Sequence, residues 1–214
     1  MIIVQAVVLT LSGKNKGICL AVYYPEKNRL YRLVSDTNAG ELPISWKDNI
    51  SLLDVIEFTP MSFPKNGPQV DNIQIDIRAG IKSLGKYNGS IYSIYTALND
   101  GRDNNGKIFG STSYKLDKAD YFKHSLELVK VSSMKIIKQS NGNKVTGKAE
   151  FICGDKQHSF YSVTDFEYDI RNKAFDCWNI GDAFIVVSIP PEPYISPTGE
   201  NKGYYKFVSA IYEQ

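Results

Sequence analysis

The chain has 214 residues, of which 43% are hydrophobic and 12% aromatic, enough apolar surface for one large domain or two small ones. The formal net charge of +2 is too small to imply wholesale polyanion binding. The charge is unevenly distributed, because residues 1–35 hold five Lys or Arg against one acid, and residues 165–200 hold seven acids against two bases. This pattern favours a basic face and an acidic face.

The three cysteines, Cys19, Cys153 and Cys177, are far apart, odd in number, and placed in or beside apolar runs. This argues against a secreted disulfide framework and indicates a reducing compartment. The apolar start of the chain lacks a basic flank and is interrupted by Gln5 and Thr10, which is not a signal-peptide layout, and no stretch could span a bilayer. We therefore expect a cytoplasmic protein with free thiols, no bound metal and no membrane contact.

The first third of the chain predicts β-strands over residues 2–11, 17–24 and 29–35, which are rich in Val, Leu, Ile and Tyr. Tight turns are expected at residues 12–17 and 25–28, where Gly, Asn and Pro supply turn conformations. The result is a three-stranded meander. Its open end is expected to carry four basic residues, Lys14, Lys16, Lys27 and Arg29.

Further along, residues 52–62 and 70–77 have strand character, with a polar loop carrying Trp46 before them. Residues 90–99 instead place apolar side chains at helical spacing, with Ser90 as the N-cap and Asn99 at the stop. The glycine-containing segment from Gly80 to Gly89 and residues 100–113 are expected to be loops, and residues 117–123 a short helix.

A second strand series covers five segments, residues 126–138, 145–152, 158–164, 183–189 and 204–212. The acidic, aromatic segment at 166–175 is expected to be a connector, with a helix as one alternative for it. Three strands, a connector and two strands is the order of the five-stranded Greek-key barrel of the OB type. The first half follows the same order. We therefore predict an all-β protein with minor helices, built of two OB-like barrels in tandem: residues 1–115, with a helical insert near 90–99, and residues 116–214.

Several short blocks resemble a known family. The segment Leu-Thr-Leu-Ser-Gly-Lys-Asn-Lys-Gly-Ile-Cys-Leu-Ala (9–21), residues 29–35 and the Gln-Val-Asp-Asn of 69–72 resemble the opening blocks of the bacterial dual OB-containing domain family. Residues 162–165 and 203–211 resemble its closing blocks. The resemblance implies two OB-like barrels in tandem, often found in bacterial conflict and defence contexts, with a proposed role in nucleic-acid or nucleotide recognition.

The candidate binding residues follow from the chemistry of nucleic acids. Basic side chains on the first meander could contact phosphates, namely Lys14, Lys16, Arg29 and Arg32. Exposed aromatic rings could stack on bases, and the first-half candidates are Tyr23, Tyr31 and Trp46. In the second half, the strands that would frame a binding face carry Phe160, Tyr204 and Lys206.

Plainer interpretations stay open for each of these residues. The turn lysines could simply be solvated, and most aromatic residues in a barrel this size belong to its core. Arg32 could bind a phosphate or pair with an acid such as Asp54 or Glu57. Asp165 is expected to cap the connector that follows the third strand of the second half.

The sequence gives little support for an enzyme, because it contains no P-loop, GxSxG or HExxH motif. We expect a non-enzymatic module without a cofactor that binds nucleic acid, preferentially single-stranded, or a nucleotide, and that works in a bacterial defence system. The first alternative is a protein-interaction subunit that uses the acidic 165–200 region. The second is a small hydrolase that uses Cys153 and His158.

Overall fold

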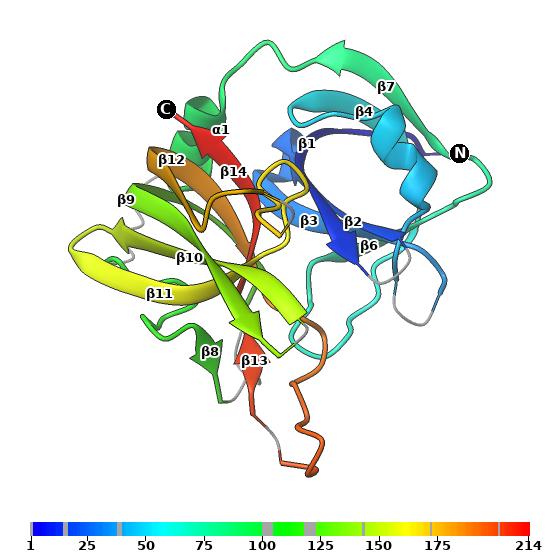
Figure 1. Cartoon of the computed structure of the whole chain (residues 1–214). Coiled ribbons are helices and arrows are strands. Elements are labelled where there is room, and N and C mark those ends of the chain that lie inside the picture. Colours follow the sequence, from blue (N-terminus) through cyan, green and yellow to red (C-terminus); the bar gives the residue numbers. More distant parts are fainter. Residues whose placement is uncertain are drawn as a thin grey trace.

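The structure, a computed structural model, describes residues 2–14, 17–37, 40–99, 105–117, 123–142, 144–171, 173–200 and 202–214. It consists of two curled β-sheets that lie side by side, with the helix α1 (Ile91–Leu98) beside their contact and a small two-stranded sheet projecting below (Figure 1). The predicted all-β architecture of two tandem OB-like barrels is confirmed.

The first barrel contains seven strands: β1 (Val4–Lys14), β2 (Gly17–Tyr24), β3 (Arg29–Val34), β4 (Asp54–Phe58), β5 (Pro60–Ser62), β6 (Asn72–Ile75) and β7 (Ile81–Lys86). Their order in the sheet is β5-β6-β3-β2-β1-β4-β7. Only Thr59 separates β4 from β5 in the chain, although the two lie near opposite ends of this order, so the sheet curls into a barrel. The strands β3 and β6 run parallel, whereas their other neighbours are antiparallel.

The strand β7 was not predicted, because the sequence around Gly80 and Gly85 indicated a loop. Its residues are almost all exposed, so they show no apolar alternation that a sequence pattern could reveal. Backbone pairing with β4, from Asp54 opposite Lys86 to Phe58 opposite Ile81, forms the strand instead. Two short 3₁₀ helices, η1 (Pro25–Lys27) and η2 (Ile44–Asp48), lie in the connections of this barrel.

The second barrel is closed by five strands: β9 (Leu126–Asn141), β10 (Lys144–Cys153), β11 (Lys156–Val163), β12 (Cys177–Ser188) and β14 (Phe207–Glu213). Its order is β10-β11-β14-β12-β9, and β11 runs parallel to β14. This repeats the connectivity of β1, β2, β3, β4–β5 and β6 in the first barrel. The strands β8 (Lys115–Leu116) and β13 (Tyr204–Tyr205) form the small sheet.

The three predicted helices have different outcomes. The connector at residues 166–175 contains no helix in the part that the structure describes, and it forms turns. Most of the short helix expected over residues 117–123 lies outside the described residues. The helix α1 is confirmed: Ser90 accepts a hydrogen bond from the Ser93 backbone N–H, and the Ser93 hydroxyl oxygen accepts one from the Ser90 N–H.

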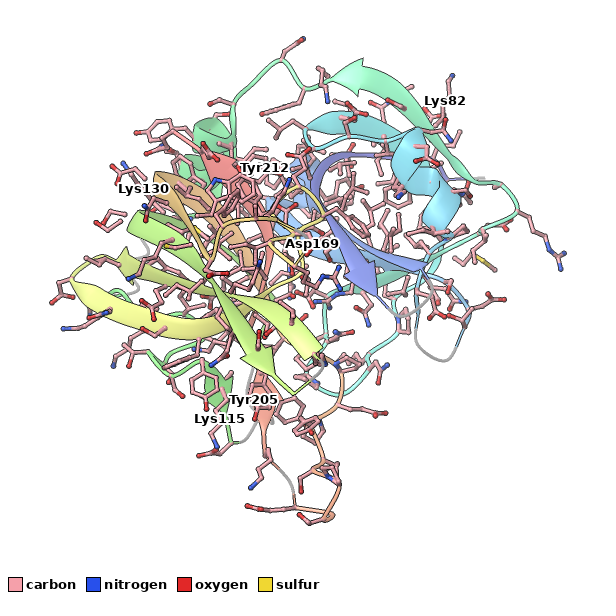
Figure 2. All side chains as sticks on the ribbon, viewed as in Figure 1. Lys82, Lys115, Lys130, Asp169, Tyr205 and Tyr212 are labelled. Atoms are coloured by element: carbon pink, nitrogen blue, oxygen red, sulfur yellow. The ribbon has the colours of Figure 1, made fainter. Side chains whose placement is uncertain are left out.

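The contact between the barrels is a third apolar cluster, separate from the two barrel cores. It combines outward-facing residues of β1, β2 and β3 with outward-facing residues of β9, β12 and β14, and α1 adds Ile94. Tyr212, labelled between the two barrels in Figure 2, donates a hydrogen bond from its hydroxyl to the Leu9 carbonyl oxygen at 2.8 Å. Alternation along each strand thus builds two buried faces, one inside the barrel and one against its neighbour.

The domain division at residues 115 and 116 stays a prediction. In the structure, Ile108, Phe109 and Leu116 pack in the core of the second barrel.

The three cysteines are free, with Cys153 buried and Cys177 exposed. Across the ranges that the structure describes, no helix has the length and apolarity needed to cross a membrane.

Candidate functional site

The outer face of the second and third strands is where OB barrels commonly bind ligands. In the first barrel this face is covered, because Ala21, Tyr23 and Leu30 pack in the cluster between the barrels. Tyr23 is only 6% exposed, and its hydroxyl donates to the Asn28 side-chain oxygen at 3.1 Å. The Tyr23 ring is therefore covered by protein in this structure and presents no open face on which a base could stack.

Arg32 lies on the same covered face and is 1% exposed. Its Nη1 donates to the Ser125 hydroxyl at 2.9 Å and to the Asn72 side-chain oxygen at 3.4 Å, and it lies 3.9 Å from the Asp71 carboxylate. The backbone N–H of Ser125 also donates to Asp71. Arg32 thus pairs with an acid, but the acid is Asp71, which no local pattern indicated; Asp54 instead pairs with Lys86.

The structure does not place Lys14 and Arg29 at the same end of the first meander. Lys14 pairs with Gly17 at the start of β2, whereas Arg29 pairs with Tyr24 at its end. Lys16 and the side chain of Lys14 lie outside the described residues. Arg29 is exposed and donates to the Lys123 carbonyl oxygen at 2.8 Å, with its guanidinium carbon 5.7 Å from the centre of the Tyr31 ring. The rings of Tyr31 and Trp46 are half-buried against the first core.

The second barrel presents the corresponding face, on β10 and β11, to solvent. Phe160 is 49% exposed and Ile152 is 37% exposed. Lys148 on β10 donates to the hydroxyl of Ser162 on β11 at 2.7 Å, and partial burial lowers its pKa. The two barrels therefore share a topology but expose different faces.

Four aromatic rings continue from this face onto the small sheet and the loop beyond it. We call them the aromatic row: Phe160, Tyr114, Tyr205 and Tyr194. Each ring centre lies 5.8 Å from the next. Figure 2 shows Tyr205 and Lys115 on the projecting sheet, away from the contact between the barrels. Phe160 and Tyr194 at the two ends are about half exposed, at 49% and 51%.

Phe160 adopts a left-handed backbone conformation, with φ of 68°. It lies in a β-bulge, where the pairing of β10 with β11 shifts between Ala149 and Phe151. A left-handed conformation costs a residue with a Cβ roughly 1–2 kcal/mol, and bulges re-aim side chains at functional sites. Phe160 is one of the predicted binding residues, and the β-bulge places its ring on the exposed face of β11.

Lys206 and Tyr204, predicted as binding residues, have other positions. Lys206 is 1% exposed, and its Nζ donates to the carbonyl oxygens of Ile108 and Ser111 at 2.6 and 2.8 Å. Its backbone N–H donates to the Tyr114 carbonyl oxygen at 2.9 Å. Burial lowers the pKa of Lys206 to about 8. Lys206 therefore holds the segment that carries Tyr114, while Tyr204 pairs with Leu116 and packs against the second core.

The pair Cys153 and His158, considered above as a hydrolase site, is buried. Burial raises the pKa of the Cys153 thiol to about 11, which disfavours the thiolate that nucleophilic attack requires. The His158 ring contacts the Tyr161 hydroxyl through Nδ1 at 3.0 Å and the Gly106 carbonyl oxygen through Nε2 at 2.7 Å. Both ring nitrogens are thus engaged with other groups.

A cavity of about 640 Å³ lies where the β1–β2 turn meets the connector after β11. The carboxylate of Asp165 on its wall accepts hydrogen bonds from the backbone N–H groups of Glu167 and Ile211, and burial raises its pKa to about 6. Asp165 therefore caps the start of the connector, as expected. The Arg171 guanidinium is bound through two nitrogens by Asp169, so its charge is balanced within the cavity wall.

Among the described residues, no group of three or more His, Cys, Asp and Glu side chains is placed to hold a metal ion. The model of a family described as the dual OB-containing domain matches residues 4–211 of the sequence. A search of curated proteins with this sequence found no match.

Proposed function

Because the chain belongs to the dual OB-containing domain family, we propose that it is a binding module that takes up single-stranded nucleic acid on the exposed face of its second barrel. The aromatic row carries this proposal, since every base has a flat face that can stack on a ring. The first barrel then serves as a support, because its own face is covered.

Charge beside the aromatic row is modest, which favours stacking over phosphate contacts there. Lys115 lies 3.8 Å from Asp117, and Lys202 is paired with Glu200. Both pairs are short-range neighbours in the chain, so their cations are partly neutralised. Binding at the row should therefore depend weakly on salt and tolerate changes of base sequence.

The experiment compares Phe160→Gly with the wild type in fluorescence titrations of single-stranded DNA, single-stranded RNA and mononucleotides. Glycine adopts the left-handed conformation without strain, which offsets the lost contact with Tyr114, worth roughly 0.5–1.5 kcal/mol. We therefore expect an unfolding midpoint close to that of the wild type. The loss of one stacking ring should weaken strand binding by about 1–3 kcal/mol.

Tyr194→Ala should act in the same direction, because Tyr194 is exposed at the other end of the row. The matched control is Phe63→Ala, which removes a ring of similar exposure, 66%, from the first barrel. Strand binding that is absent in the wild type, or equally reduced by the control, would contradict the proposal.

A protein partner is the second candidate, and one observation favours it. Exposed apolar side chains lie on the two segments that extend from the Val4–Phe58 pairing of the first barrel, Ile2 and Ile3 before β1 and Met61 and Phe63 at and after β5. Exposed apolar patches are a feature of interaction surfaces. The defence role and the cytoplasmic location suggested by the sequence stay predictions.

A further inference from the structure

A second cavity, of about 580 Å³, lies at the seam between the barrels. We call it the basic cleft. Three elements form its walls: the turn after β2, the C-terminal end of α1 and the chain that leads into β9. A volume of this size falls in the range of pockets that hold small organic ligands, about 300–1,000 Å³.

The charge of this cleft is strongly one-sided. Lys27, Arg29 and Lys123 line it, together with His124, and Glu127 is its one acidic lining residue. Within the described ranges, Lys27, Arg29 and Lys123 take part in no ion pair with a carboxylate. Three fixed positive charges around one hollow create a potential that attracts an anion.

The single acid is already engaged. Both carboxylate oxygens of Glu127 accept the backbone N–H of Phe109 at 3.0 Å, and Oε1 lies 2.7 Å from His124 Nε2. Its side chain is 11% exposed. Glu127 therefore holds the cleft wall together, and its one negative charge leaves the three basic side chains in excess.

Contacts across the seam set the position of the Arg29 guanidinium and of the turn that carries Lys27. Arg29, from the first barrel, donates from Nη2 to the carbonyl oxygen of Lys123 at 2.8 Å. Asn28, in the left-handed conformation with φ of 45°, donates from its side-chain nitrogen to the Ala97 carbonyl oxygen at 2.8 Å. These two hydrogen bonds tie the turn to the chain before β9 and to α1, so the cleft exists only when both barrels are in contact.

Below the charges the lining is apolar, with Leu30, Leu98, Leu126 and Leu128. A ligand with an anionic group and a less polar body suits this combination, because ring carbons can pack on leucines while the anion meets the cations. We propose that the basic cleft binds a phosphate-bearing ligand of nucleotide size, either a free nucleotide or a nucleotide unit of a bound strand. The strand form of this proposal rests on the proposed function, whereas the free-nucleotide form does not.

The test uses the full chain with Lys27 and Lys123 both changed to glutamate. The control is Lys65→Glu with Lys82→Glu, which makes the same change of net charge on exposed first-barrel lysines outside the cleft lining; Lys82 is labelled on β7 in Figure 2. Each variant is titrated with ATP and with a single-stranded oligonucleotide at two salt concentrations. Thermal unfolding checks that both variants are folded.

Loss of charge-assisted contacts to phosphate should weaken binding by roughly tenfold to a hundredfold. A loss confined to ATP identifies a free nucleotide as the ligand. Weaker oligonucleotide binding, with the salt slope reduced by about 0.7 for each lost contact, identifies a strand. Binding of both probes that is unchanged in the cleft variant, or reduced equally in the control, would overturn the proposal. Phe160→Gly reports separately on the aromatic row.

Discussion

The two barrels repeat one connectivity but use its outer faces differently. The first barrel covers the outer face of β2 and β3 with the second barrel, whereas the second leaves the outer face of β10 and β11 exposed. The side chains explain the difference: Ala21 and Leu30 are apolar and close-packed, while Lys148 and Phe160 meet solvent. A common ligand-binding face can thus become a structural contact when its residues can be buried.

The largest expected loss of stability comes from changing Asp71, which pairs with Arg32 on the covered face of the first barrel. Asp71→Ala leaves the buried Arg32 guanidinium without its carboxylate and removes the acceptor for the Ser125 N–H. Removing one partner of a buried pair costs about 3–5 kcal/mol. Urea unfolding should show this loss.

Asp36→Ala, at an exposed position of the same barrel, is the control and should change stability by less than about 0.5 kcal/mol. If Asp71→Ala is as mild as the control, the Arg32 network does not hold the barrels together.

The second prediction concerns the support of the exposed face. Lys206→Met removes the donor for the buried carbonyl oxygen of Ile108 and the partly buried one of Ser111, and a buried group left unsatisfied costs about 1–3 kcal/mol. The segment that carries Tyr114 should loosen, so strand binding should weaken together with stability.

Lys206 also predicts a pH dependence. Its pKa is about 8 in the folded protein against an ordinary value of 10.5, so the unfolded chain holds more protons between these values. Wild-type stability should therefore gain a contribution as pH rises from about 8 to 10.5. Chemical unfolding across this range measures it, and a Lys206→Met variant that keeps the same rise would contradict this origin.

The third prediction compares the ends of the third strands. In the first barrel, the Ser35 hydroxyl accepts the Thr37 N–H, and in the second barrel the Asp165 carboxylate accepts the Glu167 N–H. Of these two acceptors, only the Asp165 carboxylate is a titratable group. Burial raises the folded pKa of Asp165 to about 6 from 3.8, so the folded state binds more protons between these values, and this contribution to stability increases as pH falls through about 6.

The contribution is on the order of 3 kcal/mol, because one proton is bound over this pKa difference at about 1.4 kcal/mol for each pKa unit. Asp165→Asn should remove it, so the difference in unfolding free energy between the variant and the wild type should change between neutral and acidic pH. Parallel stability curves for the two proteins would show that Asp165 does not titrate in this range.

The smallest effect concerns α1, which has no counterpart among the described residues of the second barrel and contributes Ile94 to the cluster between the barrels. Ser90→Ala removes the hydroxyl that accepts the Ser93 N–H, at about 1 kcal/mol. Ser90→Asp keeps an acceptor and should restore most of the loss. Thermal unfolding distinguishes the two variants, and equal midpoints would indicate that the cap contributes nothing measurable.

The amino-acid sequence by itself determined those features whose cause is local. The apolar and aromatic residues of β2, the turn around Asn28 and the Ser90 cap each depend on residues within a few positions, so their patterns predicted a strand, a hairpin and a helix. The strand order then indicated two OB-like barrels.

Only the tertiary structure decided which faces are open. Arg32 meets Asp71 and Ser125 across long stretches of chain, so its local pattern could not distinguish a ligand-binding arginine from a buried one. Tyr114 and Tyr205 become neighbours because β8 pairs with β13, two-residue strands too short to predict from periodicity. Exposure depends on what packs against a residue from elsewhere in the chain, and that information is non-local.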